Sequence, residues 1–522
     1  MEYLKKHNFL FFPLTLGLIL MVYSWFSSFP LMYNSVDDYV FNHLSIYYWF
    51  GLPISLASMF VIATTSENNT LKWIMTLSIV TAMYSLFYYH SSLPTSDANL
   101  FRGLQENFAN TKSLEIASYR HSYYQWPSVF ILTYIATSIS GISLANLEFL
   151  MFGIIGFLLA TTLYVYSTKS FSKSGFIAVI AFFIVNSSYV NYQFAPYTIA
   201  LCFLMLLFIL DTKRPNSSIT VIMLLLFFIT TFTHAFVPIF FSIFLLVNWI
   251  ITRSKRYGGL FLFTLSTYFL YQFTSASYSF ANIILRALSQ GSELPRVITI
   301  IPWFNPIDAI AQNFTVLTIS LCAIISFIGF ILLLVKRKLR YQDKAIFIAG
   351  IFYIGLGAVL YSLGSRAIAI AFIAVSLGAS YLHQSRFKPY LNVIFLILLL
   401  TFTSILVRST FVKTGLFFQT NESYESANFA IANYNWDEQN IIVADYRTTD
   451  YLAGRTAAGN AEFSIDPDPS TFENADMIFY TLGLGINMDH YFNHSIEDTL
   501  NEDMLNVCYD NGYSMIITRN SP

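Results

Sequence analysis

The stretch from Val316 to Arg340, VLTISLCAIISFIGFILLLVKRKLR, decides the fold class of this chain. Its first twenty residues carry no charge, and four of its last five are basic. A helix of about 20 such residues covers the hydrocarbon core of a bilayer, where the backbone must satisfy its own hydrogen bonds. The stretch therefore predicts a transmembrane helix that ends in a positively charged loop.

Apolar runs of the same kind recur along most of the chain and stop at Val407. Of its 522 residues, 56% are hydrophobic and 11% are charged, whereas about 25% of the residues in a soluble globular protein are charged. We expect a mainly α, polytopic transmembrane domain over residues 1–410, followed by a polar domain over residues 411–522. The formal net charge of −1 argues against a nucleic-acid partner, which requires a basic surface.

The apolar runs between polar breaks predict about thirteen membrane spans, several of them shorter than the ideal length. They are Phe9–Phe26, Leu44–Thr64, Trp73–Tyr89, Phe149–Tyr166, Gly175–Tyr189, Pro196–Leu210, Ile219–Thr233, Val237–Ile251, Leu260–Phe273, Val316–Val335, Ala345–Tyr361, Ala367–Leu382 and Leu391–Val407.

Lysine and arginine residues in the short loops predict the direction of these spans, because positively charged loops stay in the cytoplasm. All the basic loops fall on one side if residues 127–140 form an interfacial or re-entrant helix on the outer side; the alternative is an ordinary span. Thirteen spans from a cytoplasmic amino terminus then place the carboxyl-terminal domain outside a plasma membrane. The basic residues are Lys5, Lys6, Lys72, Lys169, Lys173, Lys213, Arg214, Arg253, Lys255, Arg256, Lys336, Arg337, Lys338, Arg340, Arg386 and Lys388.

The polar domain, residues 411–522, shows the alternating short elements of a small α/β fold. A helix-like stretch to Tyr434 comes first, and Met504–Asn511 predicts a second helix. Strands are expected at Ile441–Ala444, Met477–Tyr480 and Ser514–Thr518. The many acids of this domain do not have the spacing of an EF-hand, so an acidic solvated surface is the better interpretation.

Two predicted outer loops, residues 91–126 and 274–314, are long, and long loops are uncommon unless they have a function. An acid, a helix and an aromatic cluster would together form the rim of a cavity against the membrane. Tyrosine and tryptophan also gather at membrane interfaces without any such role. The residues of interest in the first loop are Asp97, Glu106, Tyr123 and Trp126.

The order Asp97, Glu106, Tyr123, Trp126, Pro127 resembles the first outer loop of the GT-C superfamily of membrane glycosyltransferases. Two further segments are similar to a prokaryotic branch of that superfamily. They are residues 191–201, NYQFAPYTIAL, which open a span, and residues 233–238, THAFVP, which lie between spans. The resemblance implies an enzyme of a prokaryotic plasma membrane that transfers a sugar from a polyprenyl-phosphate donor to an acceptor on the outer face.

The resemblance also implies a carboxylate in the first outer loop, which acts as general base or holds a divalent metal such as Mg²⁺ or Mn²⁺ near the donor phosphate. We choose Asp97 for this role. The sequence departs from the family because it has no Asp-x-Asp or Glu-x-Asp motif and because the loop follows the third predicted span. Asp37 and Asp38, directly after the first span, are therefore the alternatives. A further alternative is that all three are solvated loop acids.

Displacement of a lipid phosphate also requires a cation that holds the leaving group. Arg366 and His234 are the candidates, with Glu106, Tyr123 and Trp126 as further substrate-binding residues. Arg366 lies near the outer end of a predicted span, where an arginine is costly unless it is paired or snorkels to the interface. His234 lies in an outer turn, where helix capping is the alternative role.

Two other function classes share this layout. A lipid-linked sugar transporter or polysaccharide polymerase would have a similar number of spans, but a transporter is expected to show internal repeats or charges at mid-membrane, and neither is evident. A non-catalytic structural membrane protein whose carboxyl-terminal domain binds partners is the remaining alternative.

Overall fold

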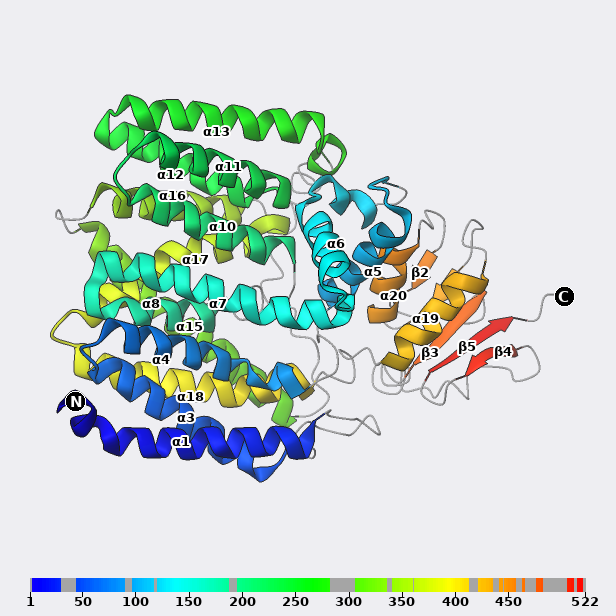
Figure 1. Cartoon of the computed structure of the whole chain (residues 1–522), viewed down its shortest axis with the longest axis horizontal. Helices are drawn as coiled ribbons and strands as arrows, with labels where there is room; N and C mark the ends of the chain where they lie inside the picture. The colour runs from blue at the N-terminus through cyan, green and yellow to red at the C-terminus, as the bar shows by residue number, and fades with distance from the viewer. Residues whose placement is uncertain are drawn as a thin grey trace.

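The computed structural model of the chain is mainly helical, with a bundle of helices that lie side by side and a small α/β unit at one end of it (Figure 1). The description below covers residues 2–29, 44–89, 96–116, 120–186, 195–281, 306–335, 340–359, 361–412, 421–434, 441–444, 446–456, 462–464, 476–481, 505–510 and 514–519.

Each of the thirteen expected spans coincides with a helix of the bundle. These helices are α1 (Glu2–Ser28), α3 (Ile46–Thr65), α4 (Asn69–Met83), α7 (Leu144–Phe171), α8 (Gly175–Val185), α10 (Pro196–Asp211), α11 (Ser217–Thr233), α12 (Val237–Thr252), α13 (Lys255–Thr274), α15 (Pro306–Val335), α16 (Tyr341–Val359), α17 (Tyr361–His383) and α18 (Lys388–Val412).

Four apolar helical stretches in the described part of the chain are long enough to cross a membrane: Phe9–Ser28, Ile46–Thr65, Leu144–Val185 and Val316–Val335. Several other helices are equally apolar but shorter, among them α10, α11 and α12. The chain therefore has the helices of a membrane protein, and thirteen crossings stay a prediction.

Helix α8 lies at the centre of the bundle, where it contacts α7, α15 and α17. Every residue from Gly175 to Ile184 is buried, as expected of a helix that is apolar on all sides. Helices α15 and α17 approach closely where Gly329 meets Gly378: a Cβ atom on Gly329 would lie 2.1 Å from the Gly378 carbonyl oxygen. Small residues allow this contact because helices that pack without a hydrophobic driving force need close backbone approach.

Several of the predicted basic loops meet at the end of the bundle where the amino terminus lies (Figure 1). The Lys72 ammonium donates a hydrogen bond to the Lys173 carbonyl oxygen at 3.1 Å, and the Lys169 ammonium donates to the Thr212 hydroxyl at 2.6 Å. Arg340 forms an ion pair with Asp343, 2.8 Å between Nη2 and Oδ1. The structure thus places these loops at one end, and the assignment of that end to the cytoplasm stays a prediction.

The first long outer loop folds at the opposite end of the bundle, beside the α/β unit (Figure 1). It contains α5 (Ser96–Thr111) and η2 (Arg120–Gln125), and α6 (Ser128–Ser140) follows. With thirteen residues, α6 is shorter than a span requires, and it packs on α5 as well as on α7. That residues 127–140 lie in the membrane interface stays a prediction. Most of the second long loop, 274–314, lies outside the described residues.

The carboxyl-terminal unit has two described helices, α19 (Asn421–Asn433) and α20 (Tyr446–Arg455), and a five-stranded sheet. The strand order is β2-β1-β3-β5-β4, with β1 parallel to β2 and β3, and β5 antiparallel to β3 and β4. The strands are β1 (Ile441–Val443), β2 (Glu462–Ser464), β3 (Met477–Thr481), β4 (Leu505–Asp510) and β5 (Ser514–Arg519).

Three expected strands of this unit are present as β1, β3 and β5, and α19 is the expected first helix. The helix predicted for Met504–Asn511 is wrong, because residues 505–510 form strand β4, which pairs with β5. Leu505, Val507 and Tyr509 alternate with Asn506 and Cys508, which is the period of a strand, and pairing with β5 satisfies the backbone.

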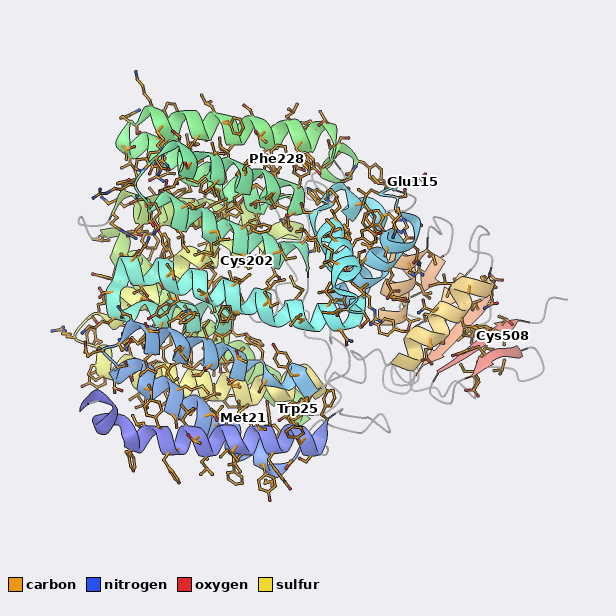
Figure 2. The ribbon with its side chains drawn as sticks, in the orientation of Figure 1. Met21, Trp25, Glu115, Cys202, Phe228 and Cys508 are labelled. Atoms are coloured by element: carbon orange, nitrogen blue, oxygen red, sulfur yellow. The ribbon has the colours of Figure 1, made fainter. Side chains whose placement is uncertain are left out.

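Three cysteines lie in the described segments, and all are free. Figure 2 shows Cys202 among the bundle helices and Cys508 on the distant sheet of the carboxyl-terminal unit. The fold therefore depends on packing rather than on cross-links.

Candidate functional site

Helix α5 of the outer loop crosses α20 of the carboxyl-terminal unit at unusually close range. A Cβ atom on Gly103 would lie 2.4 Å from the Tyr451 carbonyl oxygen, and one on Gly454 would lie 2.5 Å from the Leu100 carbonyl oxygen. Only glycine, which has no Cβ, allows two backbones to approach in this way. The paired glycines thus join the outer loop to the carboxyl-terminal unit.

Glu106 of α5 is the centre of a polar network at this crossing. Arg102 Nε lies 3.1 Å from Glu106 Oε1, and Arg455 Nε lies 3.5 Å from Glu106 Oε2. The Tyr451 hydroxyl donates a hydrogen bond to Glu106 Oε2. The Arg102 guanidinium also lies 3.8 Å from the centre of the Tyr424 ring. The Glu106 carboxylate is therefore a shared acceptor for Arg102, Tyr451 and Arg455.

The protonation of this network follows from burial and charge. Burial and the neighbouring Glu106 carboxylate raise the pKa of Tyr451, so the hydroxyl stays protonated and donates a hydrogen bond to the carboxylate. Burial opposes the charge of Arg102, but Tyr424, Glu148 and Glu106 outweigh it and raise the pKa of the guanidinium. Tyr451 and Arg102 therefore both keep their protons at neutral pH.

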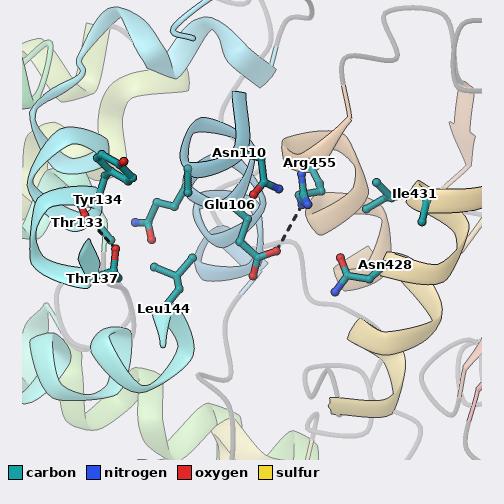
Figure 3. A pocket seen from close by; sticks show the side chains of 12 residues that line it. Glu106, Asn110, Thr133, Tyr134, Thr137, Leu144, Asn428, Ile431 and Arg455 are labelled. Carbon is teal, nitrogen blue, oxygen red and sulfur yellow. Dashed lines mark hydrogen bonds and ion pairs between the residues drawn. The ribbon is translucent and has the colours of Figure 1, made fainter. Parts of the chain in front are cut away.

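A cavity of about 660 Å³ lies beside this network, between α5, α6, the start of α7, α19 and α20. Figure 3 shows Glu106 and Asn110 on one wall, Arg455 and Asn428 on another, and Thr133 across the cavity. With its amide oxygen facing α20, Asn110 accepts hydrogen bonds from Arg455 Nη2 at 2.6 Å and Nη1 at 3.0 Å. Residues from both the outer loop and the carboxyl-terminal unit are thus needed to form the cavity.

His121 in η2 makes a second connection to α20. Its Nε2 donates a hydrogen bond to the Gly454 carbonyl oxygen at 3.2 Å, and its ring stacks on Tyr124 with 5.5 Å between centroids. The Tyr124 hydroxyl in turn donates to the Leu104 carbonyl oxygen at 2.6 Å. Burial lowers the pKa of His121, so the neutral imidazole is the form that fits here.

His234 and Trp126 belong to a separate cluster at the same end of the bundle. His234 Nδ1 accepts hydrogen bonds from the backbone N–H groups of Phe236 and Val237, at 3.1 and 3.4 Å. Its ring lies edge-on to Tyr197, with 5.3 Å between centroids. Trp126 is buried against Ala235. His234 Nδ1 thus makes the backbone contacts expected of the capping role that sequence analysis held as the alternative, and phosphate contact by His234 stays a prediction.

The remaining site residues predicted from the sequence do not line the cavity in the described part of the chain. Asp97 lies in the first turn of α5 and Arg366 lies in α17, but the side chains of both are outside the described part of the chain. Asp37 and Asp38 are also outside the described residues. Tyr123 is half-buried and packs edge-on against Phe101 rather than lining the cavity, with 5.1 Å between centroids.

No group of three or more histidine, cysteine, aspartate or glutamate residues that could hold a metal occurs among the residues that the structure describes. The described residues therefore do not form a site for Mg²⁺ or Mn²⁺. The role of Asp97 as a metal ligand stays a prediction from the sequence.

Sequence analysis missed the contribution of the carboxyl-terminal unit to this region. Tyr424, Asn428, Tyr451 and Arg455 all come from α19 and α20, and no spacing in the sequence joins them to Glu106. The sequence contains only a weak indication that this domain contributes to the site. Two tyrosines and the pair Gly454 and Arg455 lie on its short helices, and the domain was expected to be acidic and solvated.

No protein-family model and no curated protein matches this sequence. Among solved structures, the chain is similar to the crystal structure of the Archaeoglobus fulgidus oligosaccharyltransferase in complex with zinc and sulfate. The identity is 14% and the TM-score is 0.48, over 86% of this chain and 73% of that one. At this level of similarity, a functional assignment depends on the residues of the chain itself.

Proposed function

We propose that this chain is a GT-C-like glycosyltransferase that transfers a sugar from a polyprenyl-phosphate donor to an acceptor on the outer face of a prokaryotic plasma membrane. One observation carries the proposal. The three segments that resemble the superfamily meet at the end of the bundle beside the carboxyl-terminal unit: Trp126 packs on Ala235, and His234 packs on Tyr197. These contacts join stretches that are far apart in the sequence and that the resemblance singled out independently.

The reaction requires a base and a cation. The acceptor oxygen or nitrogen forms a bond to the anomeric carbon of the sugar, the bond from that carbon to the phosphate oxygen breaks, and the polyprenyl phosphate leaves. In our proposal Asp97 takes the proton from the acceptor, and Arg366 neutralises the charge that develops on the leaving phosphate. Asp37 and Asp38 are the alternative bases, and His234 positions the turn rather than binding phosphate.

The test is transfer by the purified full chain in lipid nanodiscs, with polyprenyl-phosphate-linked sugars as donors and total membrane extract as acceptor. Loss of a general base lowers the rate by about 100- to 10,000-fold, so Asp97→Asn should fall in this range. Glu115→Gln is the matched control, because Glu115 is an exposed acid of the same loop (Figure 2). It should transfer at the wild-type rate.

The outcomes distinguish the identity of the general base from the proposed transfer activity. Equal rates for wild type and Asp97→Asn would move the base to Asp37 or Asp38, and the corresponding asparagine variants identify which. Absence of transfer from every donor by the wild-type chain would contradict the proposed function itself.

A further inference from the structure

The cavity between the outer loop and the carboxyl-terminal unit contains buried polar groups that the described residues do not satisfy. Gln105 is 3% exposed and Thr133 is 4% exposed, and both line the cavity. The amide nitrogen and oxygen of Gln105 have no hydrogen-bond partner within the described part of the chain. The hydroxyl of Thr133 has none there either. Because burial of an unpaired polar group is unfavourable, these two side chains point to a partner that the described residues do not supply.

The charges at the cavity favour a neutral partner. The two charged groups that line it, Glu106 and Arg455, are paired with each other. Arg455 also donates to the Asn110 amide, and Glu106 also accepts from Arg102 and Tyr451. An anion would have to compete with the Glu106 carboxylate for Arg455, and a cation would have to compete with Arg455 for Glu106.

The remaining polar lining consists of amides and hydroxyls. Gln105 and the Thr133 hydroxyl can each donate and accept. The Asn428 oxygen already accepts from the Tyr451 hydroxyl and the Thr137 hydroxyl already donates to the Tyr134 carbonyl oxygen, so Asn428 offers its amide N–H groups and Thr137 offers an acceptor. A ligand with several adjacent groups that both donate and accept would satisfy this set, and a saccharide with vicinal hydroxyls has that pattern. The apolar side chains of Leu144 and Ile431 complete the wall and suit the carbon–hydrogen faces of a sugar ring. The volume of about 660 Å³ lies within the range of about 300–1,000 Å³ that is typical of small-molecule pockets.

We propose that this cavity is a binding site for a neutral saccharide, held by Gln105 and Thr133 from the outer loop and α6 and by Asn428 from the carboxyl-terminal unit. The site is distinct from the cluster of Trp126 and His234, and it does not depend on the proposed transfer reaction. Its two walls come from different parts of the chain, so saccharide binding would also stabilise the docking of the carboxyl-terminal unit.

Saccharide binding is measured by saturation-transfer difference NMR on the full chain in lipid nanodiscs. Nanodiscs avoid glycoside detergents, whose sugar head groups would compete for the site. The probes are neutral disaccharides, namely maltose, cellobiose and N,N′-diacetylchitobiose, with inorganic phosphate as the anionic competitor. Gln105→Met and Thr133→Val remove the unpaired polar atoms with little change of shape. We expect each to weaken saccharide binding by about tenfold, as loss of one or two hydrogen bonds would.

Stability distinguishes a binding role from a structural one. Because their polar atoms lack partners among the residues that the structure describes, Gln105→Met and Thr133→Val should keep or raise the thermal unfolding midpoint. A structural role predicts a lower midpoint with unchanged binding. A second pair of variants tests the position: Ala432→Phe would fill the cavity and abolish binding, whereas Asn433→Phe, one residue along α19 and outside the lining, should leave it unchanged.

Three results would overturn the proposal: no saturation transfer to any neutral disaccharide, displacement of the bound probe by inorganic phosphate, or equal binding by wild type and Ala432→Phe. Binding and transfer are measured separately. A chain that binds disaccharides and transfers no sugar would contradict only the proposed function, and a chain that transfers sugar but binds no disaccharide would contradict only this site.

Discussion

Arg455 of the carboxyl-terminal unit forms an ion pair with Glu106 of the first outer loop, with 3.5 Å between Nε and Oε2. Both side chains are largely buried, and Tyr451 and Arg102 complete the coordination of the carboxylate. The pair lies next to the crossing of Gly103 and Gly454. The carboxyl-terminal unit is therefore docked on the outer loop, and the cavity exists only in the docked state.

Removal of the Glu106 carboxylate should loosen this docking. Glu106→Ala leaves Arg102, Arg455 and the Tyr451 hydroxyl without their shared acceptor, and a buried donor that loses its partner costs about 1–3 kcal/mol. Because the side chains are partly exposed to water, we expect a value at the lower end of this range. The measurement is the thermal unfolding midpoint of the full chain, together with the rate at which protease releases the carboxyl-terminal unit.

The control for Glu106→Ala is Glu425→Ala, since Glu425 is an exposed acid on α19. It should release the unit at the wild-type rate. Equal protection of the unit in Glu106→Ala and wild type would show that the ion pair does not hold it.

A larger side chain at the contact between Gly103 and Gly454 should separate α5 from α20. Gly454→Ala places a Cβ atom 2.5 Å from the Leu100 carbonyl oxygen, so α5 and α20 must separate, and we expect faster proteolytic release of the carboxyl-terminal unit. Gly156→Ala is the control in α7, because nothing lies within 4 Å of its Cβ position. Alanine is more favourable than glycine in a helix by about 0.5–1 kcal/mol, so the control should be neutral or stabilising. An unchanged rate of release in Gly454→Ala would contradict the close contact between α5 and α20.

Sequence analysis predicted the bundle well because hydrophobic runs report directly on helices that avoid water. All thirteen expected spans coincide with helices, and the interfacial interpretation of α6 stays a prediction. Strand β4 was missed because a segment of six residues with three or four apolar side chains fits a helix or a strand, and only its pairing with β5 decides between them.

The polar network could not be predicted from one sequence. Glu106 and Tyr451 are separated by 345 residues, and the interaction depends on the glycine contact that brings α5 to α20. Glu106 was selected from the sequence as a substrate-binding residue, but the structure surrounds it with Arg102, Tyr451 and Arg455. The spacing of residues along the sequence predicts helices and turns, whereas the partners in this network are determined by the tertiary fold.

Docking of the carboxyl-terminal unit should weaken in acid because of His121. Burial lowers the pKa of His121 in the folded chain, whereas the unfolded chain keeps the ordinary value of about 6.5. The unfolded state therefore binds the proton more readily. The stabilising contribution is complete above about pH 6.5 and is lost as the pH falls through the folded-state pKa. Proteolytic release of the unit should accelerate over this window.

The variant His121→Gln tests the source of this pH dependence. A glutamine amide donates to the Gly454 carbonyl oxygen but does not titrate, so release of the unit should become less dependent on pH. An unchanged pH profile in His121→Gln would assign the effect to other groups.

His234 allows capping to be separated from phosphate binding. Its Nδ1 accepts from the N–H groups of Phe236 and Val237 at the start of α12, so His234→Ala should lower stability by about 1 kcal/mol, the usual cost of a lost cap. His234→Asn keeps a side-chain acceptor at the same place, and asparagine is a favourable cap, so it should restore the unfolding midpoint. Because we assign His234 to the turn rather than to the donor phosphate, His234→Asn should also transfer sugar at close to the wild-type rate. A variant with restored stability and lost transfer would instead identify the imidazole as a ligand of the donor, since the asparagine amide replaces the Nδ1 acceptor but not the Nε2–H donor of the ring.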